Sequence, residues 1–214
     1  MTKTLFVVSA NLPDGLPAYG EGPKKDYTAI ARRLGADILD WSAARRTPLL
    51  RLLSKTIGLA ATQALLAFKL RRKYDVILTD GEHIGIPLAL LLKLARARTI
   101  HVTIGHRLST AKKRVFFCWM NIQSHMNAVV LHSRYQFDFA VDQLGFRPDQ
   151  LALLPYQVDP DFWKPLPPEE VPEEQLVVSA GLEYRDYPTL FEAMDGLDAQ
   201  LVVAAASHWS KRKN

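Results

Sequence analysis

Two histidines in this sequence each follow a short apolar run, where an imidazole can act on a bound ligand. His106 comes directly after residues 102–105, and His83 follows Glu82 in residues 80–83. Histidine changes charge near neutral pH and can donate, accept or transfer a proton. His106 is therefore a candidate catalytic residue, with hydrogen bonding at a strand end as the structural alternative. Glu82 and His83 are candidates for acceptor binding, although an acidic residue there also suits the first turn of a helix.

Alternating strands and helices must bring these residues together. The predicted strands are residues 5–9, 36–41, 75–80, 99–104, 128–132 and 151–155. The predicted helices are residues 27–34, 48–74, 86–94, 110–121 and 135–144. Strands with near-continuous apolar runs, alternating with helices, indicate an α/β fold with a doubly wound parallel, Rossmann-like sheet. Ligands of such sheets bind at the carboxyl ends of the strands, where both histidines are expected to lie.

The loop after the first predicted strand is a second candidate for acceptor binding. Residues 11–22 contain Asn11, Gly15 and two further glycines. An ordinary long surface loop has the same composition, which is the structural alternative. No G-x-G-x-x-G follows the first strand and no G-x-x-x-x-G-K-S/T occurs, which argues against a dehydrogenase or a P-loop NTPase.

A change of composition predicts the domain organisation. Residues 164–175 are rich in Pro and Glu and lack apolar periodicity, which is typical of a stiff, solvated linker. Residues 1–163 precede it as one domain. Residues 176–214 restart the pattern with a strand at 176–181, a helix at 189–194 and a strand at 201–206. So few elements supply only the start of a second α/β domain, with exposed strand edges.

Charge is distributed unevenly between the two parts. Up to Pro165 there are 23 Lys and Arg against 13 Asp and Glu, and after it four against nine. A basic first part suggests an anionic partner such as phosphate, nucleic acid or an anionic lipid surface. The single cysteine, Cys118, and the lack of an apolar leader at the start favour the cytoplasm. His101, His125 and His132 lack metal-ligand spacing, so no metal site is expected.

The segment 48–74 combines many leucines with eight basic residues in and just before it. Its uncharged run, residues 56–68, is shorter than the roughly 20 residues that span a bilayer. A basic, apolar helix can instead lie on an anionic membrane surface. A core helix with a solvated basic end is the alternative.

Three segments resemble the retaining GT-B glycosyltransferases, in the family 4-like group that includes sucrose synthase and bacterial mannosyltransferases. Residues 155–165 resemble the interdomain P-N-G-V-D stretch, with Gln157 in place of its glycine. Residues 179–193 are similar to the strand-loop-helix G-R-L…K-G…T-L-L-E-A, with Leu182 where the arginine is expected. Residues 102–106 match a strand that ends in a catalytically important histidine.

The resemblance implies transfer of a sugar from a nucleotide-sugar donor to a glycan or lipid-linked acceptor, with retention and without a metal or other cofactor. It implies His106 as the catalytic residue and Gly181, Glu183 and Arg185 as donor-binding residues. The family's pair of glutamates eight residues apart is missing here, so this chain by itself is expected to be inactive. A fragment, a truncated product and one half of a split enzyme, with another chain supplying the rest of the donor domain, remain open.

The charge pattern suggests two functions other than catalysis, and only the first fits the sequence. A non-catalytic subunit that recruits a separate catalytic chain to the inner face of the membrane fits the same basic first domain. Nucleic-acid binding is not expected, because the basic residues are dispersed and aromatic residues are not interleaved with them.

Overall fold

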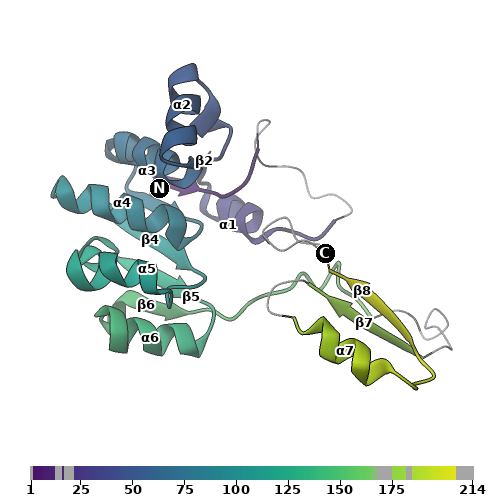
Figure 1. Cartoon of the computed structure of the whole chain (residues 1–214). Coiled ribbons are helices and arrows are strands. Elements are labelled where there is room, and N and C mark those ends of the chain that lie inside the picture. Colours follow the sequence, from purple (N-terminus) through teal and green to yellow (C-terminus); the bar gives the residue numbers. More distant parts are fainter. Residues whose placement is uncertain are drawn as a thin grey trace. The chain divides into compact units, whose positions relative to one another are not determined.

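The computed structural model describes residues 2–12, 16, 22–165, 167, 175–181 and 185–205. The chain divides into two units, Met1–Trp163 and Lys164–Asn214 (Figure 1). Most of the predicted linker, together with Gly15 and Glu183, lies outside the described residues.

A six-stranded parallel sheet forms the centre of the first unit, in the order β2-β1-β3-β4-β5-β6. The strands are β1 (Thr4–Val7), β2 (Asp37–Leu39), β3 (Val76–Thr79), β4 (Ile100–Gly105), β5 (Ala128–Leu131) and β6 (Leu151–Leu153). The predicted doubly wound α/β fold is therefore confirmed. Chain order reverses between β1 and β3, and such a switch point leaves a crevice at the carboxyl ends of the two strands.

Helices cover both faces of this sheet (Figure 1). They are α1 (Asp26–Leu34), α2 (Pro48–Thr56), α3 (Leu59–Leu70), α4 (Glu82–Leu94), α5 (Ala111–Arg114) and α6 (Arg134–Leu144). Short turns of other helix types are η1 (Ala43–Arg45), η2 (Arg71–Lys73), η3 (Val115–Trp119), η4 (Ile122–His125) and η5 (Pro148–Gln150). Alternation along β1 sends Leu5 and Val7 into a core with α3 and α4, and Phe6 into a core with α1.

The single helix predicted over residues 48–74 is wrong. The chain breaks at Gly58, whose φ of 88° and ψ of 158° belong to a region that only glycine occupies readily. The two halves then differ: α3 buries Thr62, Gln63, Ala64 and Ala67, whereas α2 has no buried residue. α3 is therefore a core helix, whereas α2 is an exposed one.

The helix predicted over residues 110–121 is also different in the structure. Only α5 is α-helical, and the chain continues as the π-helical turn η3. The wider turn places Phe117 in the core, fully buried against the ring of Phe146. Asn121 then adopts a left-handed conformation and ends the segment.

The second unit contains β7 (Leu176–Ala180), α7 (Tyr187–Met194) and β8 (Gln200–Ala204). The two strands pair in parallel over five residues each. Pro188 in the first turn and the Asp186 side chain, which accepts from the Thr189 amide, begin α7. None of this unit's described residues is buried.

Candidate functional site

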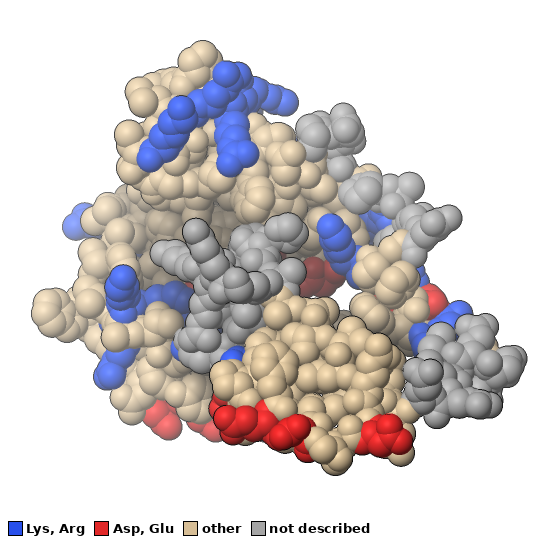
Figure 2. Space-filling view, turned by 45° about the vertical axis from the view of Figure 1, so that its right-hand side comes forward, with Lys and Arg blue, Asp and Glu red and all other residues tan. Residues whose placement is uncertain are grey.

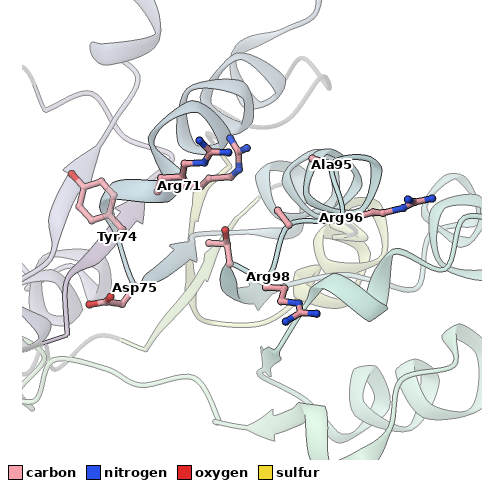
Figure 3. A pocket seen from close by; sticks show the side chains of 9 residues that line it. Arg71, Tyr74, Asp75, Ala95, Arg96 and Arg98 are labelled. Atoms are coloured by element: carbon pink, nitrogen blue, oxygen red, sulfur yellow. The ribbon is translucent and has the colours of Figure 1, made fainter.

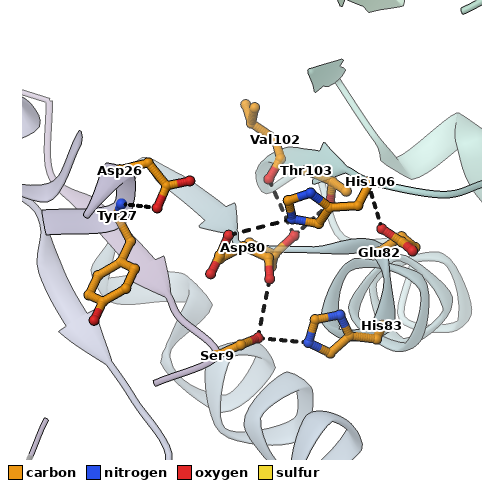
Figure 4. A network of polar contacts seen from close by, with 10 residues as sticks. Ser9, Asp26, Tyr27, Asp80, Glu82, His83, Val102, Thr103 and His106 are labelled. Carbon is orange, nitrogen blue, oxygen red and sulfur yellow. Dashed lines mark hydrogen bonds and ion pairs between the residues drawn. The ribbon is translucent and has the colours of Figure 1, made fainter. Parts of the chain in front are cut away.

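Polar side chains gather where β1, β3 and β4 end, beside the switch point of the sheet (Figure 4). Ser9 follows β1, Asp80 follows β3, and His106 follows β4. Glu82 and His83 begin α4, which leaves β3 through Gly81. The expected meeting of His83, Glu82 and His106 at one edge therefore occurs in the structure.

His106 lies in an acidic environment. Its Nε2 is 3.9 Å from Asp80 Oδ1, and its side chain keeps 40% of its surface exposed. Attraction to the Asp80 carboxylate raises the pKa of His106 above its ordinary value, against the opposing effect of partial burial. The imidazole is thus a solvent-accessible group that is more readily protonated than a free histidine.

Glu82 fixes the backbone on which His106 stands. The residue is 6% exposed, and its carboxylate accepts from the His106 amide at 2.9 Å and from Lys113 Nζ at 2.6 Å. Burial alone would raise its pKa, but these donors hold the pKa of Glu82 below its ordinary value. The N-cap position of α4 is Gly81, and the Glu82 carboxylate faces partners inside the protein.

His83 is paired with Ser9. The Ser9 hydroxyl donates to the Asp80 carbonyl oxygen at 3.3 Å and lies 2.7 Å from His83 Nε2. Which of the two groups donates in the second bond depends on the tautomer of His83. Burial of the ring among its neighbours lowers the pKa of His83.

Three aromatic rings extend from His106 along the ends of β4, β5 and β6. The ring centroids of His106 and His132 are 5.4 Å apart, and those of His132 and Tyr156 are 4.3 Å apart, with interplanar angles of 28° and 23°. The Leu154 carbonyl oxygen holds His132 Nδ1 at 2.8 Å. Tyr156 is 71% exposed, which leaves ring surface at the far end of this stack for stacking against a ligand.

A buried polar cluster supports β3 and β4 beneath the site. His101 Nδ1 donates to the His125 carbonyl at 3.2 Å, so Nε2 accepts from Thr79 or Thr103, at 3.2 and 3.0 Å. Full burial lowers the pKa of His101 to about 4, and the ring is neutral at physiological pH. Gly85 packs α4 onto this cluster, because an added Cβ would lie 2.2 Å from Thr103 Oγ1.

The remaining predicted residues are dispersed. Asn11 is exposed and makes no hydrogen bond with another described residue. Gly181 and Arg185 belong to the second unit, where a Cβ on Gly181 would lie 3.7 Å from Arg185 Nε. The Gly181 amide already donates to the Ala204 carbonyl at 2.9 Å, so this glycine can offer a ligand room but no N–H. Arg185 is exposed.

Sequence reasoning missed Ser9, Asp80, Lys113, His132 and Tyr156 as members of this site. Ser9, Asp80 and His132 each stand at the end of a predicted strand, and that position was a usable signal. Lys113 gave no such signal, because its approach to Glu82 depends on how α5 folds back over 31 residues.

No group of three or more His, Cys, Asp or Glu in the described ranges is arranged to hold a metal ion. Within the same ranges, every helix is too short or too polar to cross a membrane.

Comparisons with known proteins give one distant likeness to report. No protein-family description and no curated protein matches the chain. Among solved structures, it is similar to the glycosyltransferase SnogD from Streptomyces nogalater, with a TM-score of 0.36 and 15% sequence identity. The alignment covers 94% of this chain and 66% of SnogD, so this chain spans just under two thirds of that protein's length. A likeness of this degree does not identify an activity.

Proposed function

We propose that this chain is part of a glycosyltransferase that moves a sugar from a nucleotide-sugar donor to a glycan or lipid-linked acceptor. In the reaction, the bond between the anomeric carbon and the diphosphate breaks, and a bond to an acceptor hydroxyl oxygen forms as its proton leaves. Retention of the anomeric configuration and independence from metals follow from the resemblance to GT-B enzymes. The first unit holds the acceptor and the second contributes to donor binding.

His106 carries this proposal. It is exposed at the switch point, its backbone is fixed by Glu82, and Asp80 favours its protonated form. A positioned imidazolium can donate a hydrogen bond to a sugar hydroxyl or to the oxygen of the departing diphosphate, where negative charge develops. The exposed Tyr156, which stacks on His132 at the other end of the ring stack, offers a surface on which a ring of the acceptor can stack.

Arg185 and the space over Gly181 support a role of the second unit in holding the donor diphosphate. An arginine can bind two phosphate oxygens with its planar fork of donors. Gly181 has a φ of 96° and no side chain, so a ligand can approach the backbone there. The proposal assigns the rest of the donor site to protein outside this chain, either a longer product or a second chain.

Transfer is best tested on the protein together with its donor-site partner, by nucleotide release from a panel of nucleotide sugars with mixed glycan and lipid acceptors. We expect His106→Gln to lower kcat at least about 100-fold without changing the melting temperature. Arg147→Gln, which removes an exposed ion pair with Asp149, is the matched control and should keep full activity. Full activity of the His106→Gln variant would refute the proposed role.

A second candidate function, recruitment of a catalytic chain to an anionic membrane, is favoured by α2. Leu49 and Leu52 on this helix are 72% and 61% exposed, and Ile57 just after it is 47% exposed. No Asp or Glu occurs between Asp40 and Asp75. Figure 2 shows Lys and Arg side chains gathered at the top of the molecule, where α2 lies in Figure 1. Exposed leucines with basic neighbours suit an anionic bilayer surface.

Vesicle co-sedimentation tests recruitment separately from transfer. Replacing Leu49 and Leu52 together by Ser should reduce binding to phosphatidylglycerol vesicles several-fold, because less apolar surface enters the bilayer. Both side chains are exposed, so the melting temperature should stay unchanged. Equal binding of the parent and the variant would exclude α2 as the contact.

A further inference from the structure

A cleft lined by arginines lies at the opposite edge of the sheet from the candidate site, where β3 and β4 begin (Figure 3). Its volume is about 400 Å³, within the range of small-molecule sites. The segment after α3 and the segment after α4 form its walls. The lining residues are Arg71, Arg72, Tyr74, Asp75, Ala95, Arg96, Ala97, Arg98 and Thr99.

The cleft has a large excess of positive charge. Its one carboxylate, Asp75, already accepts from the Lys3 amide at 2.7 Å. Arg72, Arg96 and Arg98 are exposed, and their side chains form no ion pair or hydrogen bond with any part of the chain that the structure describes. Arg71 is held in place, since it donates to the Phe68 carbonyl at 2.8 Å and stacks 3.9 Å from the Phe68 ring centroid. Three arginines are thus available to a ligand around a fixed fourth.

Helix ends alone explain part of this charge but not all of it. Basic residues after α3 and α4 face the negative ends of two helix dipoles, which favours Lys or Arg there. Arg96, however, has a φ of 49°, in the left-handed region where a helix normally ends with glycine. The Arg96 amide donates to the Lys93 carbonyl, and the Ala97 amide donates to the Leu92 carbonyl. The same pair of bonds closes helices that end with glycine. A side chain is kept at a position where glycine would be less strained, which points to a use for that side chain.

We propose that this cleft binds a multiply charged phosphate group, presented either by a small soluble phosphate compound or by a lipid headgroup. Arginine forks match phosphate oxygens, and the exposed side chains of Arg72, Arg96 and Arg98 can turn toward a ligand that enters from solvent. Lys3, whose Nζ lies 5.1 Å from the Tyr74 ring centroid, adds a further positive charge at the rim. The cleft shares no residue with the proposed donor and acceptor sites, and the proposal does not depend on them.

Inorganic pyrophosphate, titrated calorimetrically into the full chain at low salt, is the soluble probe. Vesicles with and without phosphatidic acid are the second probe. We expect the double variant Arg72→Gln/Arg98→Gln to lose at least about tenfold in affinity for whichever probe binds, since two charged contacts are removed. Arg33→Gln, an exposed arginine at the end of α1, removes the same kind of charge elsewhere and should bind as the parent does. Arg185→Gln shows whether pyrophosphate occupies the proposed donor loop instead.

Arg96→Gly separates ligand binding from stability. Relief of the left-handed strain should keep or raise the melting temperature by about 2–4 °C, while affinity for the probe falls. Asn121→Gly relieves the same strain, at a φ of 46°, without removing a charge, and should leave affinity unchanged. Loss of pyrophosphate binding in the cleft variants identifies a soluble ligand, and loss of vesicle binding alone identifies a headgroup. If neither probe binds, or both bind the cleft variants and the parent equally, the proposal is wrong.

Discussion

Asp80 sets the charge of His106, because its carboxylate is the main reason that the pKa of His106 is raised. In Asp80→Asn this attraction is lost, so the pKa of His106 should fall. NMR titration of the His106 ring protons measures this directly and needs no substrate. His132 lies in the same aromatic stack and reports whether the site itself has been disturbed. An unchanged titration of His106 would mean that Asp80 does not control its charge.

Glu82 should matter for stability as well as for position. Glu82→Gln removes the charge that Lys113 and the His106 amide share, and leaves Lys113 poorly paired with its side chain only 24% exposed. We expect a loss of about 1–3 kcal/mol in the free energy of unfolding, measured by urea denaturation. Asp149→Asn breaks an ion pair whose two side chains are 71% and 69% exposed, and should have almost no effect. Equal losses in the two variants would contradict this assignment.

The sequence was sufficient to place His106, His83 and Glu82 at one edge of the sheet, because each follows a predicted strand. It did not reveal what they contact. Whether Glu82 faces a ligand or the His106 amide depends on the approach of β4 to α4, a distance that residue types alone do not determine. The same holds for the ring stack of His106, His132 and Tyr156, which joins three strand ends far apart in the chain.

Among the elements, the turn from β3 into α4 depends on Gly81. Its φ is 111°, and a Cβ there would lie 2.5 Å from the His83 ring. We expect Gly81→Ala to cost about 1–3 kcal/mol in backbone strain and to move His83 away from Ser9. Urea unfolding measures the cost, and the His83 NMR signals report the displacement.

Gly58→Ala is the matched control for this turn. Gly58 also has a positive φ, but nothing lies within 4 Å of its added Cβ. It should therefore lose similar stability while the His83 signals stay in place. If both variants left the His83 signals unchanged, the turn would not be what positions this histidine.

The buried polar cluster around His101, beneath β3 and β4, makes the stability of the fold depend on pH. His101 has a pKa of about 4 when folded, below its value of about 6.5 when unfolded. Between these values the unfolded chain binds more protons, so stability falls as the pH drops through this window. From pH 7 to pH 5 the loss from His101 should be about 2 kcal/mol.

Urea midpoints measured across this pH range, for the parent and for His101→Gln, isolate that loss. The raised pKa of His106 acts in the opposite direction, and the lowered pKa of His83 acts in the same direction. Both histidines are present in the parent and the variant, so their effects cancel in the comparison. Parallel curves for the two proteins would show that His101 is not the acid-sensitive group.

Element type was predictable from apolar periodicity, but element breaks were not. Gly58 lies within a run whose leucines continue on both sides, and only the backbone geometry there separates an exposed helix from a core helix. The π-helical turn η3 likewise responds to the packing of Phe117 against Phe146, a tertiary contact that has no local pattern.

For the whole molecule, charge and composition predicted a basic α/β first unit, and the six-stranded parallel sheet confirms its fold. The predicted linker begins at residue 164, and the second unit of the structure also begins at Lys164. The order of strands was not predictable from the sequence, because parallel neighbours are chosen by packing across the sheet. That order creates the switch point on which the whole candidate site depends.

The two units should differ greatly in local stability. All four residues of β1 are buried, whereas no described residue of the second unit is, and Val178 in β7 is 61% exposed. A two-stranded sheet with one helix is marginally stable in water, so its hydrogen bonds should open far more often than those of a covered sheet. Hydrogen exchange followed by NMR should find the amides of β7 at least roughly a hundredfold less protected than those of β1. Comparable protection in β7 and β1 would contradict this expectation and would require a partner surface that covers the second unit. The donor-site chain of the proposed function is the first candidate for that partner, and adding it to the exchange experiment would test it.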